Sequence, residues 1–405
     1  MPIQITGADG QTTNISYNLA GQITSITNAL SQTTTFSYNG NAFLTTITGP
    51  LSGDSTSFTY DNADRVSSVT DSQGYTLNYA YDNLNRLTSV TYPDGSTDSI
   101  KYVNLDPSIY TDRQGRVTQV MYDENRRLSV VVDPEARITQ YLWCSCGALE
   151  EFVDPNGNET SFIRDEEGRL LSKFNPDRSI EDTSYDSIGR VASNTSPKGI
   201  RTTYAYYPDN QPETISTAGL SPIQSTYDPT YGLLTSISQG SLSYAYSYNP
   251  VGAPGALRPS QVSAPNGSIS FTYDALGRVS SWSTANGTES YQFDQGSRIS
   301  QVQNPLGTFN LSYLGATDQI TQIAYPNGTS ENYSYLPNNQ DRRLSQLAFT
   351  GPNGNISTYG YQYNPVGTIS EWSVQTASNG QTKTFSPDYD AADQLVSSER
   401  IGADR

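Results

Sequence analysis

Tyr81-Asp82-Asn83-Leu84-Asn85-Arg86-Leu87 decides the fold, because the chain repeats this pattern from one end to the other. Aligned on the first Tyr, 18 copies occur, mostly 20 to 22 residues apart. A fixed period of this length indicates a tandem-repeat architecture. We call the aligned residue the structural anchor of its repeat. The anchors are Tyr17, Tyr38, Tyr60, Tyr81, Tyr102, Tyr122, Trp143, Arg164, Tyr185, Tyr206, Tyr227, Tyr248, Tyr273, Phe293, Tyr313, Tyr335, Tyr363 and Tyr389.

Each period has room for two short strands and two turns. Aromatic residues two apart, such as Tyr79 and Tyr81, predict two rings on one face of a strand. Asp82, after the anchor, is typical of a turn in which a side chain binds its own backbone. Leu87 and Val90 follow at a three-residue step, which breaks strict alternation, so we expect a β-bulge there.

Each period contains a second turn, which has a different sequence from the first. Tyr92-Pro93-Asp94-Gly95 and Pro326-Asn327-Gly328 are examples, in which Pro presets one turn position and Asp-Gly or Asn-Gly takes the next two. The unit is therefore a β-hairpin of about 21 residues. We expect an all-β fold in which successive hairpins pair into one continuous, curved antiparallel sheet over residues 1–405. No stretch has a sustained 3.6-residue apolar period, so no helix longer than about two turns is expected.

The charge balance of the chain indicates which classes of binding partner are compatible with it. There are 23 basic and 40 acidic residues, a net charge of −17, which argues against binding to nucleic acid and favours solubility or a cationic partner. No apolar run approaches 18 residues, so no transmembrane segment is predicted.

The chain contains no histidine, which excludes Ser-His-Asp and Cys-His nucleophile arrangements. Acidic runs at residues 150–151 and 165–167 could in principle supply paired carboxylates, but Asp is a regular turn residue of the repeat. The calcium-ligand spacing of an EF-hand is missing. We therefore predict no catalytic residue, no metal site and no cofactor, and a protein that is not an enzyme.

Cys144 and Cys146 are the two cysteines, and they follow an anchor. They could be half a metal site or a redox pair, but a structural zinc needs four ligands. We interpret them as ordinary turn residues.

The repeated aromatic and basic residues also have two interpretations. The stripe of anchor rings fills one face of the sheet, or it forms a platform for sugars or peptides. Repeating Arg residues, such as Arg65 and Arg86, are expected to bind carboxylates or carbonyls of neighbouring turns.

The pattern Tyr-Asp-x-x-Gly-Arg-Leu/Val, alternating with Asp-Pro-x-Gly turns, resembles the YD repeats of RHS proteins, toxin-complex shells and teneurins. This resemblance covers essentially the whole chain. It implies a spiralling β-sheet that winds into a hollow shell, which in bacterial members encloses a toxin and in animal members displays adhesion surfaces. Residues 143–149 resemble a variant repeat of bacterial RHS-like proteins. The resemblance thus implies a secreted or cell-surface bacterial protein.

Three functions remain open. The strip is part of a shell around a polypeptide cargo, an adhesion or carbohydrate-binding module, or the subunit of a filament that self-associates through exposed strand edges. Residues 389–395 still form an ordinary repeat, and the sequence stops ten residues later, which favours a piece of a larger shell over a free-standing repeat protein.

The spacing is irregular in three places. Tyr248 to Tyr273, Tyr335 to Tyr363 and Tyr363 to Tyr389 are 25, 28 and 26 residues apart. Extra residues must form longer loops or longer hairpins. We expect residues 250–259 and 337–343 to project from the same rim, because insertions in repeat proteins collect on one face.

Overall fold

The computed structural model describes residues 1, 3–377 and 380–401. They form one 37-stranded antiparallel sheet and a single 3-10 turn, η1 (Asn338–Gln340). Each strand pairs with the next one along the chain, from β1 with β2 to β36 with β37. The predicted fold class is confirmed. No helix in the described part of the chain is long and apolar enough to cross a membrane.

The strands are short and evenly spaced through most of the chain. The first eighteen are β1 (Gln4–Thr6), β2 (Thr12–Tyr17), β3 (Ile23–Thr27), β4 (Thr33–Tyr38), β5 (Leu44–Thr48), β6 (Ser55–Tyr60), β7 (Val66–Thr70), β8 (Thr76–Tyr81), β9 (Leu87–Thr91), β10 (Thr97–Val103), β11 (Asp106–Thr111), β12 (Val117–Tyr122), β13 (Leu128–Val132), β14 (Ile138–Trp143), β15 (Leu149–Val153), β16 (Glu159–Arg164), β17 (Leu170–Phe174) and β18 (Ile180–Tyr185). The remaining strands are β19 (Val191–Thr195), β20 (Arg201–Tyr206), β21 (Pro212–Thr217), β22 (Ile223–Tyr227), β23 (Leu234–Gln239), β24 (Leu242–Tyr248), β25 (Pro259–Ala264), β26 (Gly267–Tyr273), β27 (Val279–Thr284), β28 (Gly287–Phe293), β29 (Ile299–Asn304), β30 (Gly307–Tyr313), β31 (Ile320–Ala324), β32 (Ser330–Tyr335), β33 (Leu344–Gly351), β34 (Gly354–Tyr363), β35 (Ile369–Thr376), β36 (Thr382–Tyr389) and β37 (Leu395–Ile401).

The turn after most anchors is built as the sequence predicts, although Tyr102 is followed by a shorter connection of residues 104–105 between β10 and β11. Between β8 and β9, the Asp82 side chain accepts hydrogen bonds from the backbone N–H groups of Leu84 and Arg86, at 2.8 and 3.1 Å. Asn85 takes the left-handed conformation, with φ of 61°. Asn tolerates this conformation better than most residues because its short polar side chain can bind locally.

The predicted β-bulge is confirmed at the start of the strand that follows the anchor. Ala80 pairs with Ser89, but Tyr81 pairs with Leu87, so Thr88 is an extra residue. The same register shift precedes Tyr60 and Tyr313, among other anchors. Because a bulge increases the local twist, its repetition contributes to the bending of the strip.

The sheet is a single layer, with no second layer covering either face. Strand β8 alternates between half-buried Leu77, Tyr79 and Tyr81 and exposed Asn78 and Ala80. No large side chain of the described residues is fully buried. Aromatic anchors are therefore half-buried rather than enclosed in a core, because each ring is covered only by its neighbours along the strip.

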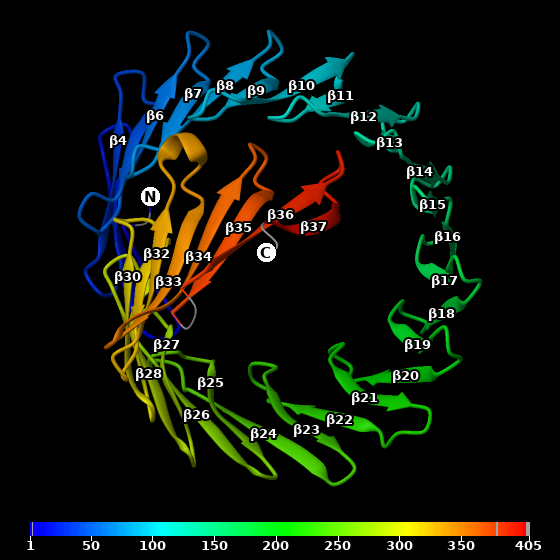
Figure 1. Ribbon diagram of the computed structural model, residues 1–405. Helices are drawn as coiled ribbons and strands as arrows, with labels where there is room; N and C mark the ends of the chain where they lie inside the picture. Colours follow the sequence, from blue (N-terminus) through cyan, green and yellow to red (C-terminus); the bar gives the residue numbers. More distant parts are fainter. Residues whose placement is uncertain (2, 378–379, 402–405) are drawn as a thin grey trace.

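The strip curls round until its C-terminal strands pass beside strands near its N-terminus (Figure 1). It has two edges. Turns that follow an anchor form the anchor edge, and the other turns, such as residues 92–96, form the return edge. Residues 249–258 and 336–343 both belong to the anchor edge, because they follow β24 and β32. The expectation that both irregular segments lie on the same rim is confirmed. The extra residues of the last hairpins lengthen β33 to β36 instead.

Candidate functional site

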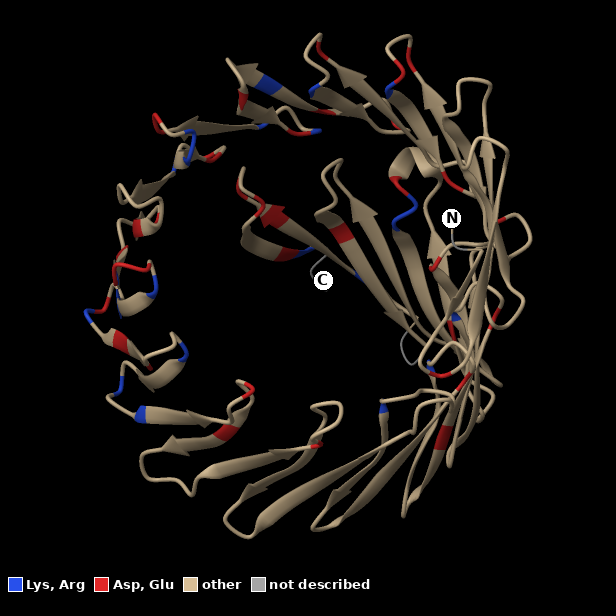
Figure 2. Cartoon of the chain, turned by 180° about the vertical axis from the view of Figure 1, so that it is seen from behind, with Lys and Arg blue, Asp and Glu red and all other residues tan. Residues whose placement is uncertain are grey.

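The charged residues lie mostly at the hairpin turns, along both edges of the strip (Figure 2). Arg65 shows how they act within one edge. Its Nε donates to Asp61 of its own turn at 2.8 Å, and its Nη1 donates to the carbonyl of Asp82 in the next turn at 2.7 Å. The guanidinium also lies over the Tyr81 ring, 4.8 Å from the centroid. Arg65 therefore joins two successive hairpins, as expected for the repeated Arg residues.

The carboxylates of these turns are held in the ionised form. The side-chain hydrogen bond from Arg65 is the main cause that lowers the pKa of Asp61. Arg86 lowers the pKa of Asp82 in the same way. Each of these two turns thus contains an ion pair at the edge of the strip.

The anchor residues bind the backbone of the preceding hairpin. The Tyr81 hydroxyl donates to the carbonyl of Val66, 15 residues earlier, at 2.9 Å. Trp143 does the same through its indole nitrogen, which lies 2.7 Å from the Leu128 carbonyl. The corresponding bonds are Tyr60 to Leu44, Tyr185 to Leu170 and Tyr273 to Pro259.

Several of the predicted anchors are placed differently, among them Tyr122, Tyr227 and Tyr389. The Tyr227 ring packs edge-on against Tyr207, with 6.0 Å between centroids. Tyr122 lies beside Tyr110, and burial is the main cause that raises its pKa. Tyr389 ends β36, half-buried and paired with Leu395.

A seam forms where the anchor edge of the second turn of the spiral meets the return edge of the first. Backbone contact begins where the Gly252 N–H donates to the Ala8 carbonyl at 2.8 Å. The turn between β24 and β25 thus lies beside the turn between β1 and β2, and the turn between β36 and β37 lies beside the turn between β13 and β14. Both pairs are 23 strands apart. Anchor-edge turns and return-edge turns alternate along the strip, so an odd offset means that opposite edges meet here.

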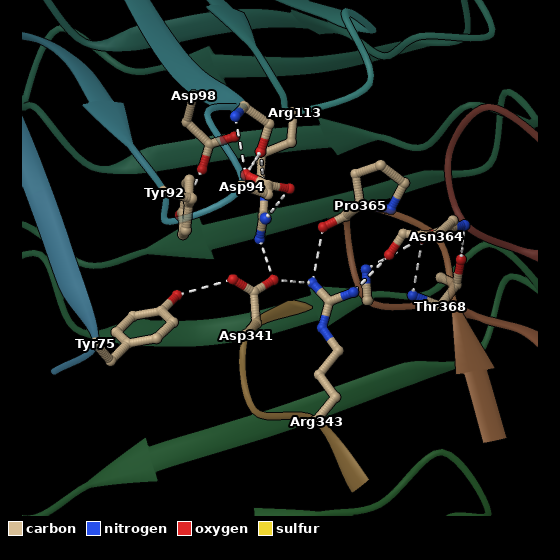
Figure 3. A network of polar contacts seen from close by, with 12 residues as sticks. Tyr75, Tyr92, Asp94, Asp98, Arg113, Asp341, Arg343, Asn364, Pro365 and Thr368 are labelled. Atoms are coloured by element: carbon tan, nitrogen blue, oxygen red, sulfur yellow. Dashed lines mark hydrogen bonds and ion pairs between the residues drawn. The ribbon is translucent and has the colours of Figure 1, made fainter. Parts of the chain in front are cut away.

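Asp341 is the centre of the seam (Figure 3). Its carboxylate accepts hydrogen bonds from Arg113 Nη1 at 2.5 Å, the Tyr75 hydroxyl at 2.9 Å and Arg343 Nη2 at 2.6 Å. The Arg113 and Asp341 side chains are only 7% and 11% exposed. Burial, followed by the hydrogen bond to Asp341, raises the pKa of Tyr75, so its hydroxyl stays a donor at neutral pH.

Neighbouring contacts extend the seam on both sides of Asp341. Arg342 binds Asp71, and the Asn338 amide donates to the Gln73 carbonyl at 3.0 Å. Further along, Arg116 forms two bonds to Asp393, at 2.8 and 2.9 Å. The hairpin turn that carries Asp393 makes a further contact across the seam, in which the backbone N–H of Ala391 donates to the carboxylate of Glu135 at 2.7 Å.

The seam is a structural joint rather than a reactive centre. A cavity of about 440 Å³ lies beside Asp341, but its charged residues are bound to one another. Arg113 also binds Asp94 at 2.8 Å, and Arg343 binds the backbone carbonyls of Asn364 and Pro365. These charges are satisfied within the chain.

The two cysteines and the acidic residues 165–167 are placed in turns, whereas Glu150 and Glu151 lie in strand β15. Asp165 binds Arg169 at 2.7 Å, and although burial raises its pKa, the bonds from Arg169 leave it below the usual value. Among the residues that the structure describes, no group of three or more acidic or cysteine side chains could hold a metal ion. Cys144 and Cys146 form a disulfide, which we did not predict. The turn brings their Cα atoms to 5.2 Å, within the range that a disulfide spans.

The seam residues escaped prediction from sequence. Arg113 and Asp341 are 228 residues apart, and neither stands at an anchor position. The irregular spacing after Tyr335 was the one available signal, because the extra residues there form the loop that carries Asp341.

A continuous antiparallel strip that spirals and binds its own edge defines a β-shell built from YD repeats. A family model described as teneurin YD-shell matches residues 2–160 and 238–342, and the chain belongs to this family. A search of curated proteins finds no match.

The fold is similar to that of solved toxin-complex proteins. Over 98% of its length the chain superposes on the crystal structure of TcdB2-TccC3, with a TM-score of 0.71 and 13% identity. For TcdB2-TccC3-Cdc42 the TM-score is 0.75, with 14% identity over 96% of the chain. This chain spans 29% and 23% of those chains. At such identities the likeness shows the fold alone.

Proposed function

We propose that this chain is a wall segment of a β-shell that encloses a polypeptide. The observation that carries the proposal is the seam. A strip that only curved would leave an open arc, whereas edge-to-edge binding between residues 71–137 and 338–394 joins successive turns into a continuous wall. Family membership supports the same conclusion, since YD strips in toxin-complex proteins share this fold.

We further propose a location outside the cytoplasm. A disulfide in a turn persists in oxidising surroundings, and Cys144–Cys146 is consistent with secretion or display at the cell surface. Mass spectrometry of protein from the native source checks whether the two thiols are oxidised.

Enclosure is tested by protection from a protease. An unstructured reporter with one protease cleavage site is fused after residue 405, and its cleavage rate is compared with that of the free reporter. We expect slower cleavage in the fusion and recovery of the fast rate in a fusion carrying Asp341→Ala and Asp393→Ala, which opens the seam. Equal rates for the free reporter, the fusion and the opened fusion would contradict enclosure.

A further inference from the structure

Four carboxylates share one position in the repeat, four residues before the anchor and on the same face as the anchor ring. They are Asp98, Glu181, Glu289 and Glu331. Each stands near the return edge of the strip, away from the anchor-edge turns. The same repeat position can therefore be compared four times within one chain.

At one of these positions, the chain supplies its own cation. Lys173 stands directly opposite Glu181 in the neighbouring strand, and its Nζ lies 3.4 Å from the carboxylate. At Asp98, the Tyr92 hydroxyl donates to the carboxylate at 2.8 Å, and the Arg113 guanidinium lies 3.9 Å from the centroid of the Tyr92 ring but is paired with Asp94 and Asp341. The Glu181 pair shows that this position in the repeat accommodates an ammonium group.

Glu331 has the same surroundings without the cation. Its carboxylate accepts the hydroxyls of Tyr325, at 2.5 Å, and of Tyr333. Ile323 stands opposite, where Glu181 has Lys173. None of the ion pairs of the described residues includes Glu331.

A cavity of about 360 Å³ lies over Glu331, lined by Tyr325, Phe349, Ile356 and Tyr359. The hydrogen bond to Glu331, followed by burial, raises the pKa of Tyr325 to about 12, so this hydroxyl remains a donor at neutral pH. Aromatic faces attract cations, and the long apolar stems of Lys and Arg side chains pack on apolar surface. Ile356, which is 49% exposed, offers such a surface.

Glu289 repeats the arrangement four strands away. Tyr291 donates to its carboxylate at 2.5 Å, Asn304 donates at 3.2 Å, and Trp282 stands directly opposite. A cavity of about 250 Å³ lies there, lined in part by Trp282 and by Leu306, which is 80% exposed. The ion pairs of the described residues do not include Glu289 either.

Basic residues are scarce in this part of the strip. Between residues 279 and 382 they are Arg298, Arg342 and Arg343, and all three stand in anchor-edge turns. Arg298 and Arg343 are bound there to turn carbonyls. The return edge around Glu289 and Glu331 is therefore anionic, aromatic and without a cation of its own in the described sequence.

We propose that the pockets at Glu289 and Glu331 bind Lys or Arg side chains of a basic polypeptide. The inference rests on the proposed function, since it names the class of polypeptide that the wall contacts. Strands β28 and β32 are four strands apart, or roughly 19 Å at the usual strand spacing. An extended peptide rises about 3.3 Å per residue, so two cations about six residues apart reach both pockets.

Fluorescence anisotropy with labelled octalysine tests the proposal at physiological ionic strength. Glu331→Gln keeps the shape of the side chain and removes its charge, and we expect the Kd to rise about five-fold or more. Glu213→Gln is the matched control, because Glu213 is exposed in β21 and the change in net charge is the same. We expect less than a two-fold effect there. Octalysine acetylated at every Nε should not bind.

Two further variants fill or open a pocket. Ile323→Lys places an ammonium opposite Glu331, as Lys173 lies opposite Glu181, and should weaken octalysine binding as much as Glu331→Gln. Lys173→Met frees Glu181 and should strengthen it. Circular dichroism establishes that each variant is folded.

The proposal that these pockets bind basic side chains is contradicted by any of three results. The wild-type protein does not bind octalysine, the acetylated peptide binds equally well, or Glu331→Gln and Glu213→Gln weaken binding equally. Each of these results leaves the shell proposal intact, because the seam is unchanged in all these variants.

Discussion

Arg65 and Arg113 belong to two regions of the molecule that use the same ion-pair chemistry over very different distances in the sequence. Arg65 binds its own turn and the next one, 17 residues on, through a 23%-exposed side chain. Arg113 binds Asp341, 228 residues away, through a side chain that is 7% exposed. In the first region, stability is local, as in other repeat arrays whose units contact only their neighbours. At the seam, contacts remote in sequence convert the strip into a wall.

The largest effect is expected at the seam. Asp341→Asn removes the charge that faces Arg113 and Arg343, and loss of one partner of a buried ion pair costs about 3 to 5 kcal/mol. Hydrogen exchange should accelerate in the return turns at residues 71–75 and 92–96 while the regular hairpins from β14 to β20 keep their protection. Asp318→Asn is the control, since Asp318 is exposed in a turn of the same edge. Uniform loss of protection would show that the seam and the hairpins unfold together.

A smaller, local effect is expected in the regular region. Tyr81→Ala removes the hydroxyl bond to Val66 and the ring under Arg65. Full truncation of a buried aromatic side chain costs about 3 to 5 kcal/mol, and we expect about 2 kcal/mol here because Tyr81 is half-buried. Hydrogen exchange should report the loss in β7 to β9. Ala80→Ser, on the opposite face, should leave exchange unchanged, and an equal effect would show that the ring stripe is not what stabilises the hairpin.

The hydroxyl alone has a still smaller role. Tyr81→Phe keeps the ring and removes the donor to the Val66 carbonyl, and a typical hydrogen bond contributes about 1 kcal/mol. The same change at Tyr231, which is 55% exposed, should have no effect. Thermal unfolding of the two variants provides the measurement, and identical midpoints would rule out a contribution from the hydroxyl.

The smallest expected effect is the dependence of folding stability on pH. The pKa values of Asp61, Asp82 and Asp123 are lowered in the folded state, mainly by hydrogen bonds from Arg side chains. The unfolded chain therefore binds protons first on acidification, and stability falls as the pH drops below the ordinary Asp value of about 4. Above that value these groups are ionised in both states and stability is constant. Thermal midpoints measured from pH 7 to pH 3 should show this profile. The hydrogen bond from Arg190 lowers the pKa of Asp186 in the same way, so Asp186→Asn should make the decline less steep.

The hairpins could be predicted from the sequence because each of their determinants is local. The Asp82 turn, the bulge after Tyr81 and the reach of Arg65 all depend on residues within about one repeat of one another. The half-burial of the rings was not predicted, because it depends on the absence of a second layer.

The seam could not be predicted for a different reason. Which turns meet depends on how many strands complete one turn of the spiral, and this number follows from small twists accumulated over many strands. A change of a few degrees per strand would place Asp341 beside a different hairpin. The pockets at Glu289 and Glu331 were not predicted, because they are lined by residues of neighbouring strands that the anchor pattern does not specify.

The offset of about 23 strands across the seam also determines the diameter of the tube. One circuit measures roughly 110 Å at the usual strand spacing of about 4.8 Å, which corresponds to a backbone diameter of roughly 35 Å. Anchor-edge turns and return-edge turns alternate along the strip, so the offset between two turns that meet across the seam is odd, and hairpins are added or lost two strands at a time. Available diameters therefore form a series with steps of roughly 3 Å. Insertion or loss of one hairpin in the arc from β14 to β23 would move the tube to the next member of that series, without altering a residue of any other hairpin.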